Sequence, residues 1–174
     1  MSQVNFKQII ALLEEFTLKT RNKLEVILAG GLAIQYYGMQ KRATVDLDAE
    51  VKGDIENLIS FLKSKGIPAD LGENISRWSV IDLVPGYRKR ALPLKKNKLL
   101  TVKVLSPIDI IISKLGRFTE QDIKDALFVT RKFRIKPQDI QNAADKAIAN
   151  SPRDTVLFLF KKNIKIFLKE IQKI

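Results

Sequence analysis

Two aspartates, Asp46 and Asp48, lie in a segment of strictly alternating polarity, and this segment constrains the fold more than any other part of the chain. The alternation over residues 44–51 predicts a half-buried strand. Residues two apart on a strand point to one face, so we expect the carboxylates roughly 6.6 Å apart along the chain. Aspartate is disfavoured inside strands, and two on one face indicate a functional site. A solvated strand face is the alternative.

A glycine pair, Gly30 and Gly31, precedes the aspartates by about fifteen residues. It follows an apolar run, residues 24–29, that predicts a buried strand, and it opens a helix expected to end near Gly38. Such a turn lets the backbone approach a phosphate group, although a tight turn chosen only for backbone freedom is the alternative. Like charges held close together are costly without a cation between them. The combination therefore predicts a site for a divalent metal and a phosphate.

The composition excludes several kinds of chemistry. The 174 residues include no cysteine and no histidine. Disulfides, thiolate nucleophiles, histidine bases and zinc sites made of these residues are therefore excluded. Any transfer reaction must depend on carboxylates, lysine, arginine and a hard cation, Mg²⁺ or alternatively Mn²⁺. We find no signal peptide and no apolar run near the about 18 residues that span a bilayer, so we expect a cytoplasmic protein without a membrane partner.

The net charge of +12 is concentrated in the second half of the chain. Residues 1–84 carry −1, and residues 85–174 carry +13. We interpret the basic half as a surface for a polyanion such as RNA, with general solubility as the alternative. The basic run from Arg88 to Lys98 suits a track for a phosphate backbone or a solvated loop.

The pattern of elements predicts a mixed α/β fold up to about residue 105 and helices after it. We expect helices over residues 3–20, 55–65, 107–115, 119–133, 137–149 and 152–172, and further strands over residues 70–72, 77–84 and 99–105. These elements indicate a core of residues 1–105 and a helical region of residues 106–174. We expect the apolar stripe of the last helix to pack on the core, with its lysines around it; a membrane surface is the alternative.

A third carboxylate, Asp82, lies in the expected strand over residues 77–84. A buried, unpaired aspartate is costly, so Asp82 either faces solvent or binds a metal. If its strand neighbours the one with Asp46 and Asp48, three carboxylates converge, as a two-metal site requires. Glu50 has the same parity as these two aspartates, but we expect it at the surface near the strand end.

The expected helices after residue 105 add a second group of charged residues. Asp122 and Asp125 are three apart and share a helix face. Lys114, on the preceding helix, can reach a phosphate. A surface cluster of salt bridges that also includes Arg117 and Lys124 is the alternative.

Two stretches resemble the nucleotidyltransferase superfamily. The sequence LAGGLA over residues 28–33, followed by RATVDLD over residues 42–48, resembles its glycine pair and D-x-D strand. The R-x-T before the D-x-D resembles the abortive-infection toxin (AbiEii-like) branch and its small relatives. In that branch a lysine on one helix also precedes a D-x-x-D stretch on the next, which Lys114 and residues 121–125 resemble. The likeness spans about residues 24–130.

The resemblance implies a nucleotidyltransferase-like mixed sheet flanked by helices, and a reaction that moves NMP from an NTP to an acceptor hydroxyl. It implies the following roles: Gly30, Gly31, Arg42 and Thr44 for nucleotide binding, together with Lys114, Asp122 and Asp125; Asp46, Asp48 and Asp82 for catalysis and for two Mg²⁺ ions.

The resemblance and the basic second half together indicate RNA, with tRNA as a candidate acceptor, as the second substrate. The branch implies a toxin of a toxin–antitoxin or phage-defence system, with an antitoxin protein as partner. The alternative is a non-catalytic nucleic-acid-binding or toxin–antitoxin partner protein on a degenerate nucleotidyltransferase fold.

Overall fold

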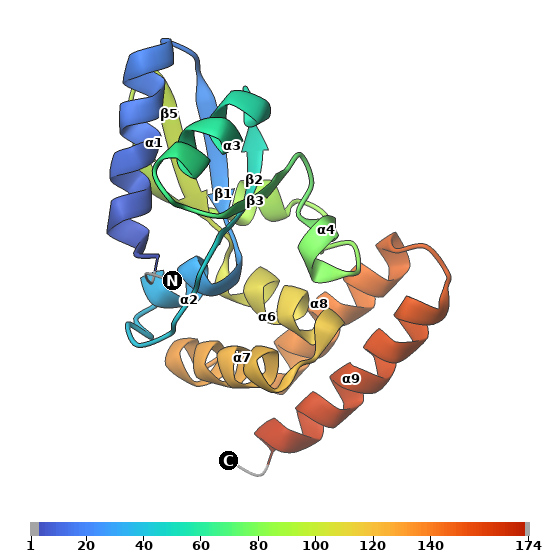
Figure 1. Ribbon diagram of the computed structural model, residues 1–174. Coiled ribbons are helices and arrows are strands. Elements are labelled where there is room, and N and C mark those ends of the chain that lie inside the picture. Colours follow the sequence, from blue (N-terminus) through green and yellow to red (C-terminus); the bar gives the residue numbers. More distant parts are fainter. Residues whose placement is uncertain (1–3, 173–174) are drawn as a thin grey trace. The chain divides into compact units, whose positions relative to one another are not determined.

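The computed structural model describes residues 4–172, without the side chains of Arg77 and Trp78, and shows the expected mixed α/β fold with a helical C-terminal part (Figure 1). The described elements are α1 (Phe6–Thr20), β1 (Leu24–Leu28), α2 (Gly30–Tyr36), β2 (Leu47–Lys52), α3 (Ile55–Ser64), β3 (Ala69–Gly72), α4 (Ser76–Ser79), α5 (Tyr87–Arg90), β4 (Leu92–Lys96), β5 (Leu100–Val104), α6 (Pro107–Arg117), α7 (Glu120–Phe133), α8 (Pro137–Asn150) and α9 (Thr155–Ile171). Within residues 4–172, no helix is long and apolar enough to cross a membrane.

The chain divides into two compact units, each of which consists of two separate stretches. Unit 1 contains Met1–Asn74 and Ala91–Leu105, and unit 2 contains Ile75–Arg90 and Ser106–Ile174. The predicted division after residue 105 stays a prediction.

Unit 1 is built on a sheet with the strand order β3-β2-β1-β5-β4. The central strand β1 runs antiparallel to β2 and parallel to β5. The outer strand β3 is parallel to β2, and β4 is antiparallel to β5. The sheet is therefore mixed, as expected.

The two faces of this sheet differ in polarity. The side chains of Val26, Leu28, Ala49, Val51, Val102 and Val104 are at most 1% exposed. The helices α1 and α3 lie over this apolar face (Figure 1), and Phe16 and Phe61 place their rings 5.5 Å apart between them. Because successive side chains alternate, the opposite face carries Asp48 and Glu50 of β2 and Lys103 of β5.

The prediction of a strand over residues 77–84 is wrong. Its first part belongs to α4, and Ile81–Val84 have no regular structure. Ile81 and Leu83 are buried, and the backbone N–H of Asp82 donates to the hydroxyl of Ser151 at 3.0 Å rather than to a neighbouring strand. Ile81, Leu83 and Val84 are therefore buried by tertiary packing, without a sheet.

The strand β4 was not expected, since the basic residues around it suggested a loop or a phosphate track. It forms the edge of the sheet, where Pro93 and the exposed Lys95 and Lys96 are well tolerated. Proline and lysine at an edge also discourage pairing with another chain.

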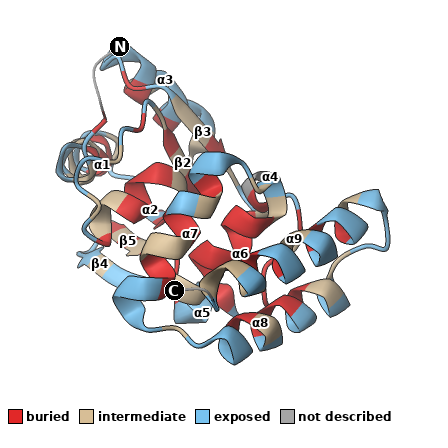
Figure 2. Ribbon diagram, turned by 90° about the horizontal axis from the view of Figure 1, so that it is seen from below, coloured by how far each residue is buried: buried red, intermediate tan, exposed pale blue. Residues whose placement is uncertain are grey.

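Unit 2 is centred on α6. Ile110, Ile111, Ile112 and Leu115 of this helix are fully buried. The prediction that the last helix packs by its apolar stripe is confirmed for the side chains of Leu157, Phe160, Ile164 and Phe167, which are at most 5% exposed. The other side of α9 is exposed over most of its length (Figure 2).

Candidate functional site

The glycine turn of unit 1 lies directly against Asp48. Gly30 has φ +54°, and a Cβ atom built on it would overlap the carboxylate of Asp48 and come within 2.8 Å of its Cγ. The backbone N–H of Ala29 also donates to the carbonyl of Asp48 at 3.0 Å. The turn before α2 therefore holds the Asp48 carboxylate beside the backbone, and a metal ion at this turn stays a prediction.

Gly31 is equally close to Thr44. A Cβ atom on Gly31 would lie 2.7 Å from Cβ and 2.8 Å from Oγ1 of Thr44. The hydroxyl of Thr44 donates to Oδ1 of Asp46 at 3.3 Å. Thr44 thus connects the second glycine to the first aspartate, and both glycines are required by close approach.

The segment that carries Arg42 is attached to α2 through Gln35. The side-chain amide of Gln35 donates to the carbonyls of Arg42 and Val4, at 2.9 and 3.1 Å, and accepts from the N–H of Phe6 at 3.3 Å. These bonds fix the backbone that leads to Thr44. Arg42 itself is half-buried, and its predicted contact with a nucleotide stays a prediction.

The predicted strand over residues 44–51 begins later than expected. β2 starts at Leu47, whose N–H donates to the carbonyl of Pro68, so Thr44 and Asp46 precede the strand. Thr44 is drawn away from the ladder because its carbonyl accepts from Val4 and its hydroxyl contacts Asp46. Both aspartates are half-buried. Asp48 lies directly against Gly30, and Asp46 is linked to Gly31 through Thr44.

A carboxylate that the sequence did not single out, Asp70 of β3, lies next to Asp48. The two residues are partners in the parallel β2–β3 ladder, so their side chains point to the same face of the sheet. Neighbouring like charges on adjacent strands are unfavourable. The strand over residues 70–72 was predicted, but only its pairing with β2 reveals this neighbour.

Glu50 is not a surface residue, so that expectation is wrong. It is 6% exposed, and it lies between Ile27 of β1 and Gly72 of β3 in the ladder. The reason is that β2 is an inner strand, flanked on both sides, rather than a strand whose end reaches solvent.

The donor atoms at this site suit a hard cation. Asp46, Asp48 and Asp70 offer only oxygen ligands, which Mg²⁺ and Mn²⁺ prefer. Within the described part of the chain, no three acidic side chains converge closely enough to hold one ion. Mg²⁺ is commonly held by one or two carboxylates, with waters and substrate phosphates as the remaining ligands. The aspartates present fit this arrangement of few carboxylates, with waters and phosphates as the other ligands.

Asp82 belongs to unit 2, in the irregular segment between α4 and α5. It lines a pocket of about 230 Å³ together with Ser76, Val80 and Ser151. The neighbouring strand that would bring it to Asp46 and Asp48 is absent from the sheet of unit 1. Its role as a third metal ligand stays a prediction without that support.

The second group of predicted residues forms a buried ionic cluster in unit 2. Lys114 of α6 lies 3.1 Å from Oδ1 of Asp122 and 3.0 Å from Oδ2 of Asp125, both on α7. Arg117 lies 2.8 Å from Asp122, and Gln121 donates to Asp125 at 2.9 Å. The side chain of Lys114 is 3% exposed, whereas that of Arg117 is 43% exposed.

This cluster balances its own charges. Burial alone raises the pKa of Asp122, but the hydrogen bonds from Arg117 and Thr119 and the charge of Lys114 outweigh it and lower that pKa. Thr119 and Asp122 also form a capping box at the start of α7. The cluster therefore stabilises the α6–α7 pair, as a salt-bridge cluster does, but it is buried rather than at the surface. Its predicted contact with a nucleotide stays a prediction.

Comparison with known proteins gives one family. Residues 4–128 match the model of the family described as "Nucleotidyltransferase of unknown function (DUF6036)". A comparison with curated proteins gave no match. The matched range contains the glycine turn, Asp46, Asp48 and Asp70, and the cluster around Lys114.

Proposed function

The chain belongs to this family of nucleotidyltransferases of unknown function, and from that premise we propose that it transfers NMP from an NTP to an acceptor hydroxyl in a Mg²⁺-dependent reaction. The observation that carries the proposal is the position of the Asp48 carboxylate against the Gly30 backbone, with Thr44 and Asp46 beside Gly31. A phosphate at the glycine turn and a cation on the aspartates would then be adjacent.

Each group of this site has a part in the reaction. The acceptor oxygen attacks the α-phosphorus, the bond to the β-phosphate oxygen breaks, and pyrophosphate leaves while the hydroxyl proton passes to a carboxylate or to water. Mg²⁺ bound to Asp46 and Asp48 would supply the positive charge that stabilises the phosphates. The glycine turn allows the backbone to approach the phosphates without a side chain in the way.

Two residues compete for the part of third carboxylate. Asp70 is supported by its position next to Asp48 in the β2–β3 ladder. Asp82 is supported by the family resemblance, but the strand that was expected to bring it to Asp46 and Asp48 is not formed. The variants Asp70→Asn and Asp82→Asn distinguish them, because only the residue that contacts the ion should weaken Mg²⁺ binding when it is changed.

We propose RNA as the acceptor class, because residues 85–174 carry a net charge of +13. We also propose that the chain belongs to the AbiEii-like branch and acts as a toxin with an antitoxin partner. The R-x-T before the D-x-D supports this placement. Expression of the wild type should then arrest growth of the host, and Asp46→Asn should abolish the arrest.

The transfer reaction is tested with the pure protein, Mg²⁺, each α-labelled NTP in turn and total RNA. We expect label in RNA with the wild type and with Asp145→Asn, which removes an exposed carboxylate of α8 that accepts a hydrogen bond from Gln141. Asp46→Asn and Asp48→Asn should lower incorporation by at least about a hundredfold. Equal incorporation by these two variants and the wild type would refute the proposal. Binding of RNA without transfer, unaffected by Mg²⁺, would favour a non-catalytic binding protein.

A further inference from the structure

The outer side of α9 combines exposed apolar side chains with lysines. Phe158, Leu159 and Ile166 are 69%, 50% and 46% exposed, although large apolar side chains usually avoid water. The lysines Lys161, Lys162, Lys165 and Lys169 are exposed on the same helix. At 100° per residue these seven residues cover one continuous arc, opposite the buried stripe of Leu157, Phe160, Ile164 and Phe167.

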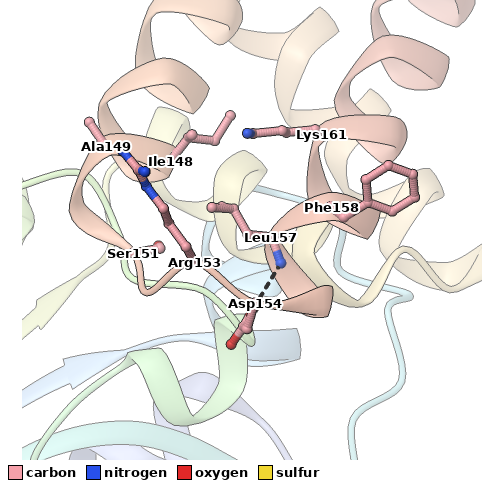
Figure 3. Close-up of a pocket in the computed structure, with 8 residues that line it drawn as sticks. All are labelled: Ile148, Ala149, Ser151, Arg153, Asp154, Leu157, Phe158 and Lys161. Atoms are coloured by element: carbon pink, nitrogen blue, oxygen red, sulfur yellow. Dashed lines mark hydrogen bonds between the residues drawn. The ribbon is translucent and has the colours of Figure 1, made fainter.

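This arc begins at a pocket where α8 ends and α9 starts. The pocket has a volume of about 510 Å³ and is lined by Ile148, Ala149, Ser151, Arg153, Asp154, Leu157, Phe158 and Lys161. Figure 3 shows Arg153 and Lys161 extending from different segments toward Ile148 and Ala149, with Leu157 between them. The one acid, Asp154, is engaged as the N-cap of α9, where it accepts from the N–H of Leu157 at 3.1 Å. The pocket thus combines two cationic side chains, Arg153 and Lys161, with the apolar side chains that line it.

We propose that this pocket and the outer side of α9 form a docking surface for an acidic, amphipathic segment of a partner protein. Carboxylates of the partner would contact Arg153, Lys161 and the following lysines, and one apolar side chain would enter the pocket over Leu157. The remaining apolar contacts would fall on Phe158, Leu159 and Ile166. The proposal does not depend on the proposed transferase activity.

The shape and chemistry of the surface favour a protein over other polyanions. A lipid bilayer is locally flat and cannot fill a concave pocket of this size. A nucleic acid would use the lysines and could stack a base on Phe158, but it gains little from the aliphatic Leu159 and Ile166. A protein segment can satisfy all three features together, since interfaces pair apolar anchors with a charged rim.

The test uses fluorescein-labelled peptides of about the length of α9, and the full protein. One set has Leu or Phe at helical spacing with Glu on the other positions; matched sets replace Glu with Gln, or the apolar residues with Ser. Fluorescence anisotropy should show binding of the acidic amphipathic set and at least about tenfold weaker binding of both matched sets. Amide shifts in NMR should fall on residues 148–169.

Variants of the protein localise the binding. Phe158→Ser and Lys161→Glu should each weaken binding at least about tenfold. Leu18→Ser and Lys63→Glu are matched controls, because they change an exposed leucine of α1 and an exposed lysine of α3. The proposal is overturned if no acidic amphipathic peptide binds, if the controls weaken binding equally, or if Phe158→Ser and Lys161→Glu leave peptide binding intact while they abolish binding to tRNA or to anionic phospholipid vesicles.

Discussion

The carboxylate of Asp48 lies so close to the backbone of Gly30 that no side chain fits between them. The two residues belong to different elements, β2 and α2, and the turn that joins β1 to α2 brings them together. Gly30 is therefore fixed by two independent requirements, a positive φ and the space taken by Asp48. Both requirements can be measured separately.

Replacement of Gly30 by alanine should destabilise the protein more than replacement of Gly66. Both glycines have positive φ, +54° and +72°, but a Cβ on Gly66 would meet nothing within 4 Å. Gly66→Ala should thus cost about 1–2 kcal/mol from backbone strain alone. Gly30→Ala adds the clash with Asp48 and should cost more, with loss of Mg²⁺ binding. Urea unfolding and Mg²⁺ titration measure the two effects; equal stability of the two variants would contradict the close approach.

Mg²⁺ should raise the thermal midpoint of the wild type if it binds the folded site. The gain in stability follows the ratio of free Mg²⁺ to its dissociation constant, about 2.7 kcal/mol at a hundredfold excess. Asp48→Asn should remove this gain, and Asp145→Asn should keep it. Differential scanning calorimetry at several Mg²⁺ concentrations makes the comparison, and a gain that persists in Asp48→Asn would place the ion elsewhere.

Loss of Lys114 should be far more costly than loss of an exposed lysine on the neighbouring helix. Lys114→Met leaves Asp122 and Asp125 buried without their shared ammonium group. The expected loss is about 3–5 kcal/mol, as for a buried ion pair with one partner removed. Lys124→Met breaks a pair with Glu120 in which both side chains are exposed, and it should change stability by at most about 1 kcal/mol. Chemical denaturation measures the loss of stability in both variants. Similar losses would contradict a structural role for the buried cluster.

The contribution of Asp122 to stability should depend on pH. Its pKa is lowered in the folded protein, so its charged form stabilises the fold at pH values above the ordinary carboxyl pKa of about 3.9. This contribution is lost as the pH falls through that value toward the folded pKa. The stability difference between the wild type and Asp122→Asn should therefore be largest near neutral pH and shrink below about pH 4. Urea unfolding at a series of pH values tests this, and a difference that grows in acid would contradict the assigned shift.

The sequence predicted elements with strong local signals and failed where tertiary contacts decide. The strand β1, the glycine turn and the helices from Pro107 onward follow from apolar periodicity, glycine and capping residues. Residues 77–84 have a strand-like alternation, but Ser79, Ile81 and Leu83 are buried within unit 2 without a sheet, and Gly116 lets the carbonyl of Ser79 approach α6 closely. The proximity of Asp48 to Asp70 could not be predicted either, because strand pairing brings together residues that are distant in the chain.

Each unit consists of two separate stretches of the chain, and this arrangement governs the order in which the protein can fold during synthesis. Strand β1 needs β5 as its parallel partner, and β5 leaves the ribosome only after residues 75–90, which belong to the other unit. Until β5 has been synthesised, one edge of β1 has no partner strand. Residues 75–90 likewise cannot pack within unit 2 until α6 has been synthesised. A truncation at any one position between residues 75 and 104 therefore leaves both units incomplete, because unit 1 needs the chain up to Leu105 and unit 2 needs the residues from Ser106 onward.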